Sequence, residues 1–598
     1  MTSTSDDPTE DVGEANNSEP TESSTPVDVV SEGTSPADST AADPTPSRGE
    51  RLMSWWSRHI RRYSYGGLVG ALLLLWASAT PSLLPRGWFF QGAVSGGSAA
   101  IGYAVGAFLT WLARFMLSRK DPWPTPSRWW WTGLGVVGLG GTAFMMYWFA
   151  RWQDELRDLM GVDHLSWTAY PLVVIVALIV FVILMSLGQA WASGLKWLVH
   201  QLNRVAPPRV SAVVGAAIVV VLTIFIVNGV FANYAMQALN SSFSAANNET
   251  KADSAPPTST LRSGGPGSLV TWDSLGREGR VFVSKGPTVQ QLSEFNGLPA
   301  IEPIRAYAGL DSADDVNQAA DLAVKELERT NAFSRKVIAV GGTTGSGWIN
   351  KSMVDSLEYM YNGDVATVSI QYSFLPSWLS FIVDSERARK AGIAIFEAVS
   401  EKVRAIPEAQ RPKLVIFGES LGSFSGEAPF GSIPTIAART DGALFSGPTF
   451  NNQLWLDTTG NRQAGSPEVK PIFNDGKQVR FIADQNDLGR PNAPWPGNRI
   501  VYLQHASDPI TWWNPGLLFS EPDWLKEQRG SDVLGSTRWI PIVSFLQLSA
   551  DMAVAVNVPD GHGHHYLSAV PYAWAQILQP PGWSPEKTKK LEPLLSRD

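Results

Sequence analysis

The sequence predicts an α-helical membrane domain of five spans followed by an α/β domain, with a mostly parallel sheet and helices on both faces. Five long stretches between residues 64 and 235 have no Asp, Glu, Lys or Arg in their interiors. Downstream, short apolar runs alternate with amphipathic segments, which is typical of a parallel sheet covered by helices. Cysteine is absent, which excludes disulfide scaffolds, zinc ribbons and thiol nucleophiles.

The first 50 residues are expected to be a disordered, acidic cytoplasmic tail. Residues 1–47 carry eleven Asp and Glu and no Lys or Arg, whereas the whole chain has a net charge of -8. The remainder is therefore close to neutral, and no basic face for nucleic acid is expected. The tail is rich in Ser, Thr and Pro and lacks the basic start and apolar core of a cleaved signal peptide. Export then depends on an internal apolar segment.

The predicted membrane domain covers residues 51–238. Each span is long enough to cross about 30 Å of hydrocarbon as a helix. Basic residues lie before the first span, between the second and third, and between the fourth and fifth, and this pattern predicts a cytoplasmic N-terminus and an extracytoplasmic C-terminal region. Pro81 makes the end of the first span its weakest part. The predicted spans are residues 64–84, 89–113, 129–150, 169–193 and 210–235.

The rest of the chain divides into a polar linker at 239–278, an α/β domain at 279–582 and a short C-terminal tail at 583–598. The linker is rich in Ser, Asn, Pro and Gly. Six short apolar runs in the α/β domain are predicted as buried strands. They are KVIAV, VATVSIQY, KLVIFG, GALFSG, RIVYLQH and AVAVNVP.

Ser420 is the predicted nucleophile. It lies in the run KLVIFGESLGSFSG, directly after a strand pattern, with Gly418 and Gly422 on either side. In a Gly-x-Ser-x-Gly turn the serine sits between a strand and a helix, and the glycines permit the tight turn and the close packing of the helix. A chance match of five residues is common, so the preceding strand carries much of the argument.

An activated serine needs a base and an orienting acid, and in this arrangement they follow in the order serine, acid, histidine. Asp508 follows the strand RIVYLQH, and Asp484, after VRFIA, is the alternative acid. His564 in DGHGHHY is the expected base, with His562 as the alternative. Neither a metal site nor a cofactor is expected, because no His-Glu-x-x-His motif occurs and GGTTGSGW lacks the Lys of a phosphate loop.

The oxyanion of the reaction needs two backbone N–H donors. Leu421 follows the nucleophile, and the glycine-rich loop after KVIAV offers Thr343 or Thr344 as the second donor. Two aromatic segments, QYSFLPSWLSF and DPITWWNPGLLF, predict an apolar pocket near the site. Its expected wall consists of Phe374, Trp378 and Trp512.

Several distinctive strings together resemble a family of actinobacterial membrane proteins that have a multi-span N-terminal region and an α/β-hydrolase catalytic domain. The resemblance covers about residues 60 to 580 and implies an α/β-hydrolase-like domain of the serine hydrolase type outside the cytoplasmic membrane. The strings are TPSLLPRGW, TGSGW, QYSFLPSWLSF, RPKLVIFGESLGS, YLQHASDPITWW and VPDGHGHHY.

The sequence thus favours a membrane-anchored extracytoplasmic serine esterase or acyltransferase that forms an acyl-enzyme. Its location favours a membrane lipid or an envelope glycolipid as substrate. The alternatives are a non-catalytic envelope receptor or assembly protein on a hydrolase fold, and a transporter, which the uncharged span interiors disfavour. The acyl donor, the acceptor and the oligomeric state stay open.

Overall fold

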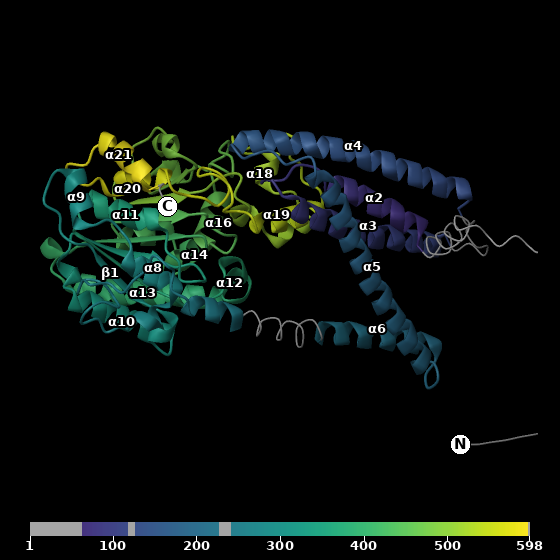
Figure 1. Cartoon of the computed structure of the whole chain (residues 1–598), viewed down its shortest axis with the longest axis horizontal. Coiled ribbons are helices and arrows are strands. Elements are labelled where there is room, and N and C mark those ends of the chain that lie inside the picture. Colours follow the sequence, from purple (N-terminus) through teal and green to yellow (C-terminus); the bar gives the residue numbers. More distant parts are fainter. Residues whose placement is uncertain (1–62, 118–125, 226–240, 596–598) are drawn as a thin grey trace, which may run out of the picture. The chain divides into compact units, whose positions relative to one another are not determined.

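The computed structural model describes residues 63–117, 126–225 and 241–595. Two kinds of element are present: long apolar helices at the start and a parallel α/β fold after them (Figure 1). The predicted acidic tail lies outside the described residues. The early helices are α2 (Tyr65–Ala77), α3 (Trp88–Met116), α4 (Arg128–Met160), α5 (Ala169–Leu202) and α6 (Pro208–Ile224).

Three of the early helices, α3, α4 and α5, are long and apolar enough to cross a membrane. The prediction of five spans is therefore corrected to three candidate spans among the described residues. Helix α2 stops at Ala77, four residues before Pro81, and the predicted remainder of that span is not helical. The description of α6 ends after 17 helical residues, and the predicted span continues into residues 226–240, which lie outside the described part.

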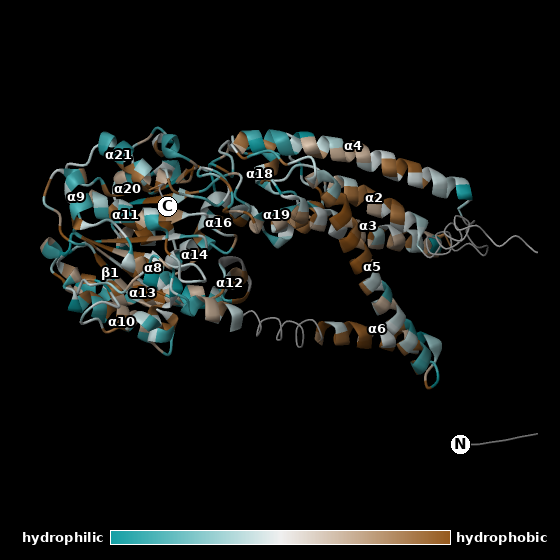
Figure 2. Ribbon diagram, viewed as in Figure 1, coloured by the Kyte–Doolittle hydropathy of each residue, from teal (hydrophilic) through white to brown (hydrophobic). Residues whose placement is uncertain are grey.

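The early helices pack through small residues. Helix α3 lies against both α2 and α5, and α6 packs on α5 (Figure 1). A Cβ on Gly70 would lie 2.2 Å from the carbonyl oxygen of Gly102, and a Cβ on Gly106 would lie 2.2 Å from that of Gly66. Such close backbone contact needs glycine and is typical of helix pairs in membranes. Much of the ribbon of α2, α3, α5 and α6 has the brown colour of hydrophobic residues (Figure 2). Many large apolar side chains of α3, α5 and α6 are exposed.

The α/β domain is built on a seven-stranded sheet with all neighbouring strands parallel, in the order β1-β3-β2-β4-β5-β7-β6. Five of the six predicted strands are present. The strands are β1 (Ile304–Ala308), β2 (Val337–Gly342), β3 (Val365–Ile370), β4 (Lys413–Glu419), β5 (Gly442–Ser446), β6 (Val479–Ile482) and β7 (Arg499–Leu503).

Helices cover both faces of this sheet, as predicted. Two separate hydrophobic clusters lie on the two sides, one including α10, α13 and α14 and the other α11 and α20. Every strand is buried along almost its full length. The helices are α8 (Gly276–Ser284), α9 (Val289–Asn296), α10 (Val316–Arg329), α11 (Lys351–Met360), α12 (Ser377–Val383), α13 (Ser385–Ala405), α14 (Leu421–Glu427), α15 (Ile433–Arg439), α16 (Gln453–Gly460), α17 (Pro509–Trp512), α18 (Asp523–Lys526), α19 (Val543–Met552), α20 (Ala569–Leu578) and α21 (Pro585–Leu595).

Two segments differ from the expected pattern. The run AVAVNVP is not a strand: α19 ends at Met552, and the residues from Ala553 onward form turns. The predicted linker also packs on the α/β domain. Asn247 is buried there and accepts a 2.9 Å hydrogen bond from Gln371, just beyond β3.

Candidate active site

Ser420 lies in the sharp turn between β4 and α14. Its backbone has φ 56° and ψ -125°, a region that side-chain-bearing residues avoid at a cost of about 1–3 kcal/mol. Its N–H donates to the carbonyl oxygen of Ser446 at 2.9 Å, and its own carbonyl oxygen accepts from the hydroxyl of Ser423 at 2.7 Å. The surrounding structure thus holds the serine in a strained conformation, which is the geometry of a strand-turn-helix nucleophile.

Glycines allow β2, β4 and α14 to approach one another at this turn. A Cβ on Gly418 would lie 2.2 Å from the carbonyl oxygen of Gly422, and a Cβ on Gly422 would lie 2.4 Å from that of Gly342. Real side chains do not fit at such distances. The glycines flanking Ser420 are therefore required for the turn, as the sequence predicts.

Asp508 is fully buried at the start of α17, beyond the carboxyl end of β7. It accepts hydrogen bonds from His564 Nδ1 at 2.7 Å, Tyr566 Oη at 2.6 Å, Thr511 Oγ1 at 3.0 Å and the Ile510 N–H at 2.8 Å. Burial raises the pKa of Asp508, but His564 and the other donors outweigh this effect, and the net pKa lies below the ordinary value. Asp508 is thus an oriented carboxylate.

His564 is 5 % exposed and uses Nδ1 to bind Asp508. Its Nε2 is buried and has no hydrogen-bond partner among the described residues. Burial lowers the pKa of His564, whereas the carboxylates of Asp508 and Glu419 raise it, and the net shift is upward. A histidine fixed at Nδ1 with a free Nε2 has the form of a general base.

The end of β5 brings the imidazole close to Ser420. Ser446 accepts the hydrogen bond from the Ser420 N–H, and a Cβ on the next residue, Gly447, would lie 2.2 Å from His564 Cε1. Within the described residues the Ser420 hydroxyl forms no hydrogen bond. Such contacts are often long without substrate and tighten when it binds.

Two backbone donors near Ser420 are free. Neither the Leu421 N–H nor the Thr343 N–H donates to another described residue, whereas the Thr344 N–H donates to the carbonyl oxygen of Trp348 at 3.0 Å. A Cβ on Gly422 would lie 3.5 Å from the carbonyl carbon of Thr343, so the β2 loop adjoins the start of α14. Of the two threonines named from the sequence, only Thr343 has its N–H available.

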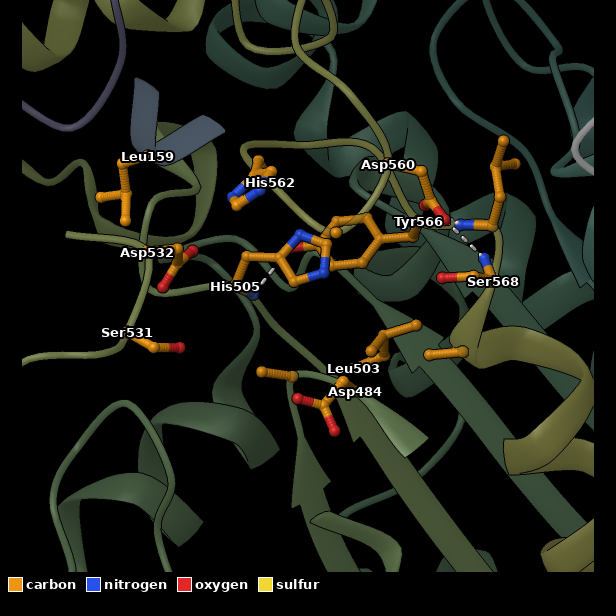
Figure 3. Close-up of a pocket in the computed structure, with 14 residues that line it drawn as sticks. Leu159, Asp484, Leu503, His505, Ser531, Asp532, Asp560, His562, Tyr566 and Ser568 are labelled. Carbon is orange, nitrogen blue, oxygen red and sulfur yellow. Dashed lines mark hydrogen bonds between the residues drawn. The ribbon is translucent and has the colours of Figure 1, made fainter. Parts of the chain in front are cut away.

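The alternative acid and base lie elsewhere. Asp484 and His562 line a separate cavity of about 240 Å³, and the Asp484 carboxylate accepts from the Asn486 N–H at 2.7 Å. Tyr566 stacks on His505 at the edge of this cavity (Figure 3). The Tyr566 hydroxyl also binds Asp508. The structure thus brings together Asp508 and His564, and neither Asp484 nor His562 joins them.

Two residues of the site were missed in the sequence. Tyr566, two residues after His564, is a further donor to the Asp508 carboxylate, and no spacing rule distinguishes it. Glu419, directly before Ser420, is buried and accepts from Asn350 at 2.6 Å and Ser446 at 3.0 Å. Burial raises the pKa of Glu419, which faces His564 electrostatically. The only feature of the sequence that could have identified Glu419 is its position directly before the predicted nucleophile.

The predicted apolar wall is only partly supported. Phe374 is half-buried, and the side chain of Trp378 lies outside the described part. Trp512 is buried between Trp455 and Trp524 and donates to the carbonyl oxygen of His505 at 2.9 Å, so it belongs to the core and is not free to line a pocket. A different aromatic cluster follows β5 and Asp508: the buried Phe381 contacts the partly buried Phe450 and Trp513, and Trp513 contacts the partly buried Phe545.

Among the described residues, no group of three or more His, Asp or Glu is arranged to hold a metal ion.

Comparisons with known proteins agree with the fold. Residues 304–591 match the model of an alpha/beta-hydrolase family, and residues 79–287 match the model of an alpha/beta-hydrolase family N-terminus. No curated protein and no solved structure matches the chain.

Proposed function

This chain is an alpha/beta-hydrolase family protein, and we propose that it is a serine esterase or acyltransferase that works through an acyl-enzyme on Ser420. One observation carries the proposal. The strained Ser420 lies close to a buried histidine whose Nδ1 binds a carboxylate and whose Nε2 has no described partner. This combination is costly to maintain in a fold and is useful for activating a hydroxyl group.

In the proposed first step, Ser420 Oγ attacks the carbonyl carbon of an ester while its proton moves to His564 Nε2. The N–H groups of Leu421 and Thr343 stabilise the oxyanion, and Asp508 stabilises the imidazolium. The tetrahedral intermediate collapses, the bond to the alcohol oxygen breaks, and the alcohol leaves with the proton from Nε2. The acyl group then remains on Ser420.

The second step determines the type of reaction. Water or another hydroxyl group attacks the acyl-enzyme and gives its proton to Nε2, and this proton returns to Ser420 Oγ as the acyl bond breaks. Water gives a hydrolase, and a sugar or lipid hydroxyl gives an acyltransferase. Apolar helices compatible with membrane insertion and the aromatic cluster of Phe381, Phe450, Trp513 and Phe545 support a membrane lipid or envelope glycolipid as the substrate.

The proposal includes the membrane arrangement. The loop after α2, the end of α4 and α19 contact one another: Arg86 N–H donates to Gln153 at 3.1 Å, and Asp551 accepts from the Leu83 N–H at 3.2 Å. These parts must share one side of a bilayer, so an even number of crossings separates Gly87 from the α/β domain. We infer that α6 crosses in addition to α3, α4 and α5.

In this arrangement the connections between α3 and α4 and between α5 and α6 lie on the side of the bilayer opposite the α/β domain. They carry most of the basic residues, which supports an extracytoplasmic active site. The chain lacks cysteine, so a single introduced thiol reports on one position. In intact cells, we expect an impermeant maleimide to label a Ser531→Cys variant, because residue 531 is exposed on the α/β domain. A control with cysteine in place of Arg204, between α5 and α6, should be labelled only after lysis. The reverse pattern would contradict the proposed orientation.

The rate should depend on the protonation of His564. A general base must be neutral, and the pKa of His564 lies above its ordinary value of about 6.5. We therefore expect kcat/KM to fall as the pH drops, with a midpoint above about 6.5. A pH profile of ester turnover measures this midpoint, and a value well below 6.5 would contradict the assigned partners of His564.

The proposed function is tested by pre-steady-state turnover of p-nitrophenyl esters with acyl chains of increasing length, using the full chain in lipid nanodiscs. We expect a burst of p-nitrophenol that approaches one per active site, followed by slower turnover. Adding a soluble alcohol should speed the slow phase if a hydroxyl is the preferred acceptor. Folded protein with neither burst nor turnover would favour a non-catalytic envelope protein.

A further inference from the structure

The segment Ser78–Gly87, which connects α2 to α3, does not lie on the surface. Ser82, Leu83, Leu84 and Arg86 are each at most 1 % exposed. Leu83 and Leu84 belong to the same hydrophobic cluster as the strands of the α/β sheet. This short connection between two apolar helices is therefore part of the core of the α/β domain.

Two side chains of α19 bind this segment: Gln547 Nε2 donates to the carbonyl oxygen of Thr80 at 2.8 Å, and Asp551 binds the residues that follow. Asp551 is fully buried, and its Oδ2 accepts hydrogen bonds from the Ser82 hydroxyl, the Leu83 N–H at 3.2 Å and the Leu84 N–H at 3.4 Å. Its Oδ1 lies 3.3 Å from Arg86 Nε, and both side chains are fully buried. A buried charge that loses its partner is strongly destabilising. Separating the segment from α19 would leave the buried charges of Arg86 and Asp551 without each other.

The segment also contacts the loop that carries the catalytic histidine. The Leu84 Cδ2 atom lies 3.3 Å from the position of a Cβ on Gly563, which has a φ of +53°. Gly563 separates His562 from His564. The His564 N–H donates to the carbonyl oxygen of Ala555 at 2.8 Å, in the turns that follow Asp551. Leu84 and Asp551 thus support the His564 loop from two positions.

The other groups that face His564 come from the α/β domain. Asp508 binds its Nδ1, Glu419 lies on the strand before Ser420, and the Tyr566 ring meets the imidazole edge to face at a centroid distance of 5.5 Å. These groups determine the charge around the imidazole. Its position depends on the backbone path of residues 553–565, which Ser507 and His505 hold through hydrogen bonds to Gly563 and which Leu84 contacts from the segment after α2.

We propose that Ser78–Gly87 is a positioning element of the active site and that Leu84 is its principal positioning residue. The site is then complete only when the region before the α/β domain is present and docked. Without Leu84, the His564 loop moves relative to Ser420, although every group that touches the substrate is retained. This inference rests on the proposed function, since it concerns the same serine and histidine.

Leu84→Ala is the direct test. The protein is the full chain in nanodiscs, and a fluorophosphonate titrates the competent sites so that kcat is expressed per site. We expect kcat per site to fall about 10- to 100-fold with KM within about twofold, because displacement of a catalytic group by about 1 Å has effects of this size. The midpoint of the pH profile should move toward 6.5 as the bond to Asp508 loosens. Leu84→Met, which nearly conserves volume, should restore most of the rate.

Val556→Ala is the matched control, because Val556 lies in the same turns but is 59 % exposed, and it should behave like the wild type. A merely structural role for Leu84 would lower the number of titrated sites without changing kcat per site or the pH midpoint, and this result would overturn the proposal. If the wild type shows no turnover that depends on Ser420, the proposed function fails as well. Normal wild-type turnover with an unaltered Leu84→Ala variant rejects the positioning role alone.

Discussion

Replacing Ser420 with alanine is expected to lower kcat for ester turnover by about 10⁴- to 10⁶-fold. The substitution removes only the hydroxyl oxygen that forms the acyl bond, and the strained turn, the free N–H groups and the Asp508–His564 pair are retained. The loss should therefore appear in kcat and abolish the burst. Steady-state turnover of a p-nitrophenyl ester in nanodiscs measures it.

Ser531→Ala is the matched control for this variant. Ser531 lines the cavity that also contains Asp484 and His562 and is not part of the Asp508–His564 arrangement. Its substitution should leave both the burst and kcat unchanged. If Ser420→Ala retained more than about a hundredth of the wild-type rate while Ser531→Ala lost activity, the nucleophile would lie at the second site.

Asp508→Asn has the second largest expected effect, a fall in kcat of about 10⁴-fold. An amide can turn its NH₂ group toward His564 Nδ1 and so stabilise the wrong tautomer, which leaves Nε2 protonated and unable to act as a base. Tyr566 and Thr511 also donate to Asp508 Oδ2. With an amide nitrogen at that position, both hydroxyl groups would lose their acceptor as well. Turnover at pH values well above the pKa of His564 separates this effect from a change in protonation.

Asp484→Asn provides the comparison, since Asp484 was the competing acid in the sequence. Its carboxylate accepts from a local backbone N–H and has no described contact with His564. We expect activity within about twofold of the wild type. Equal losses in the two variants would mean that Asp508 has no special relation to the base.

The sheet could be predicted because its strands are buried on both faces and appear as short continuous apolar runs. The run AVAVNVP follows the same pattern but forms turns. Ala555 and Val558 are buried, whereas Val556 and Asn557 between them are exposed, so the segment is neither buried throughout nor buried at every second residue. Its apolar positions pack in the cluster that contains Leu84, about 470 residues earlier in the chain, and a local pattern cannot reveal such a partner.

The candidate site was predictable to the extent that it depends on strand ends. Ser420 and Asp508 each follow a buried strand, and parallel strands bring their carboxyl ends to one edge. The choice between His562 and His564 could not be predicted, because each follows a glycine. Only the long-range hydrogen bond to Asp508 identifies His564 as the base. Trp512 was placed in the pocket because aromatic density alone does not distinguish a core residue from a wall residue.

The count of spans shows a similar limit. Hydropathy extends the first predicted span through Leu84, but the helix ends at Ala77 and the following residues pack against Asp551. Apolar residues that enter a domain core and apolar residues that face lipid have the same composition. Their tertiary partner decides between the two, and that partner lies far along the chain.

Peptide mass spectrometry of the protein after reaction with a fluorophosphonate is the most direct test of the central claim, that Ser420 is the activated nucleophile. The account predicts one phosphonyl adduct, on the peptide that contains Ser420, with its formation slowed greatly in a His564→Ala variant. An adduct on another serine, or no adduct on folded protein that turns over esters, would contradict the account.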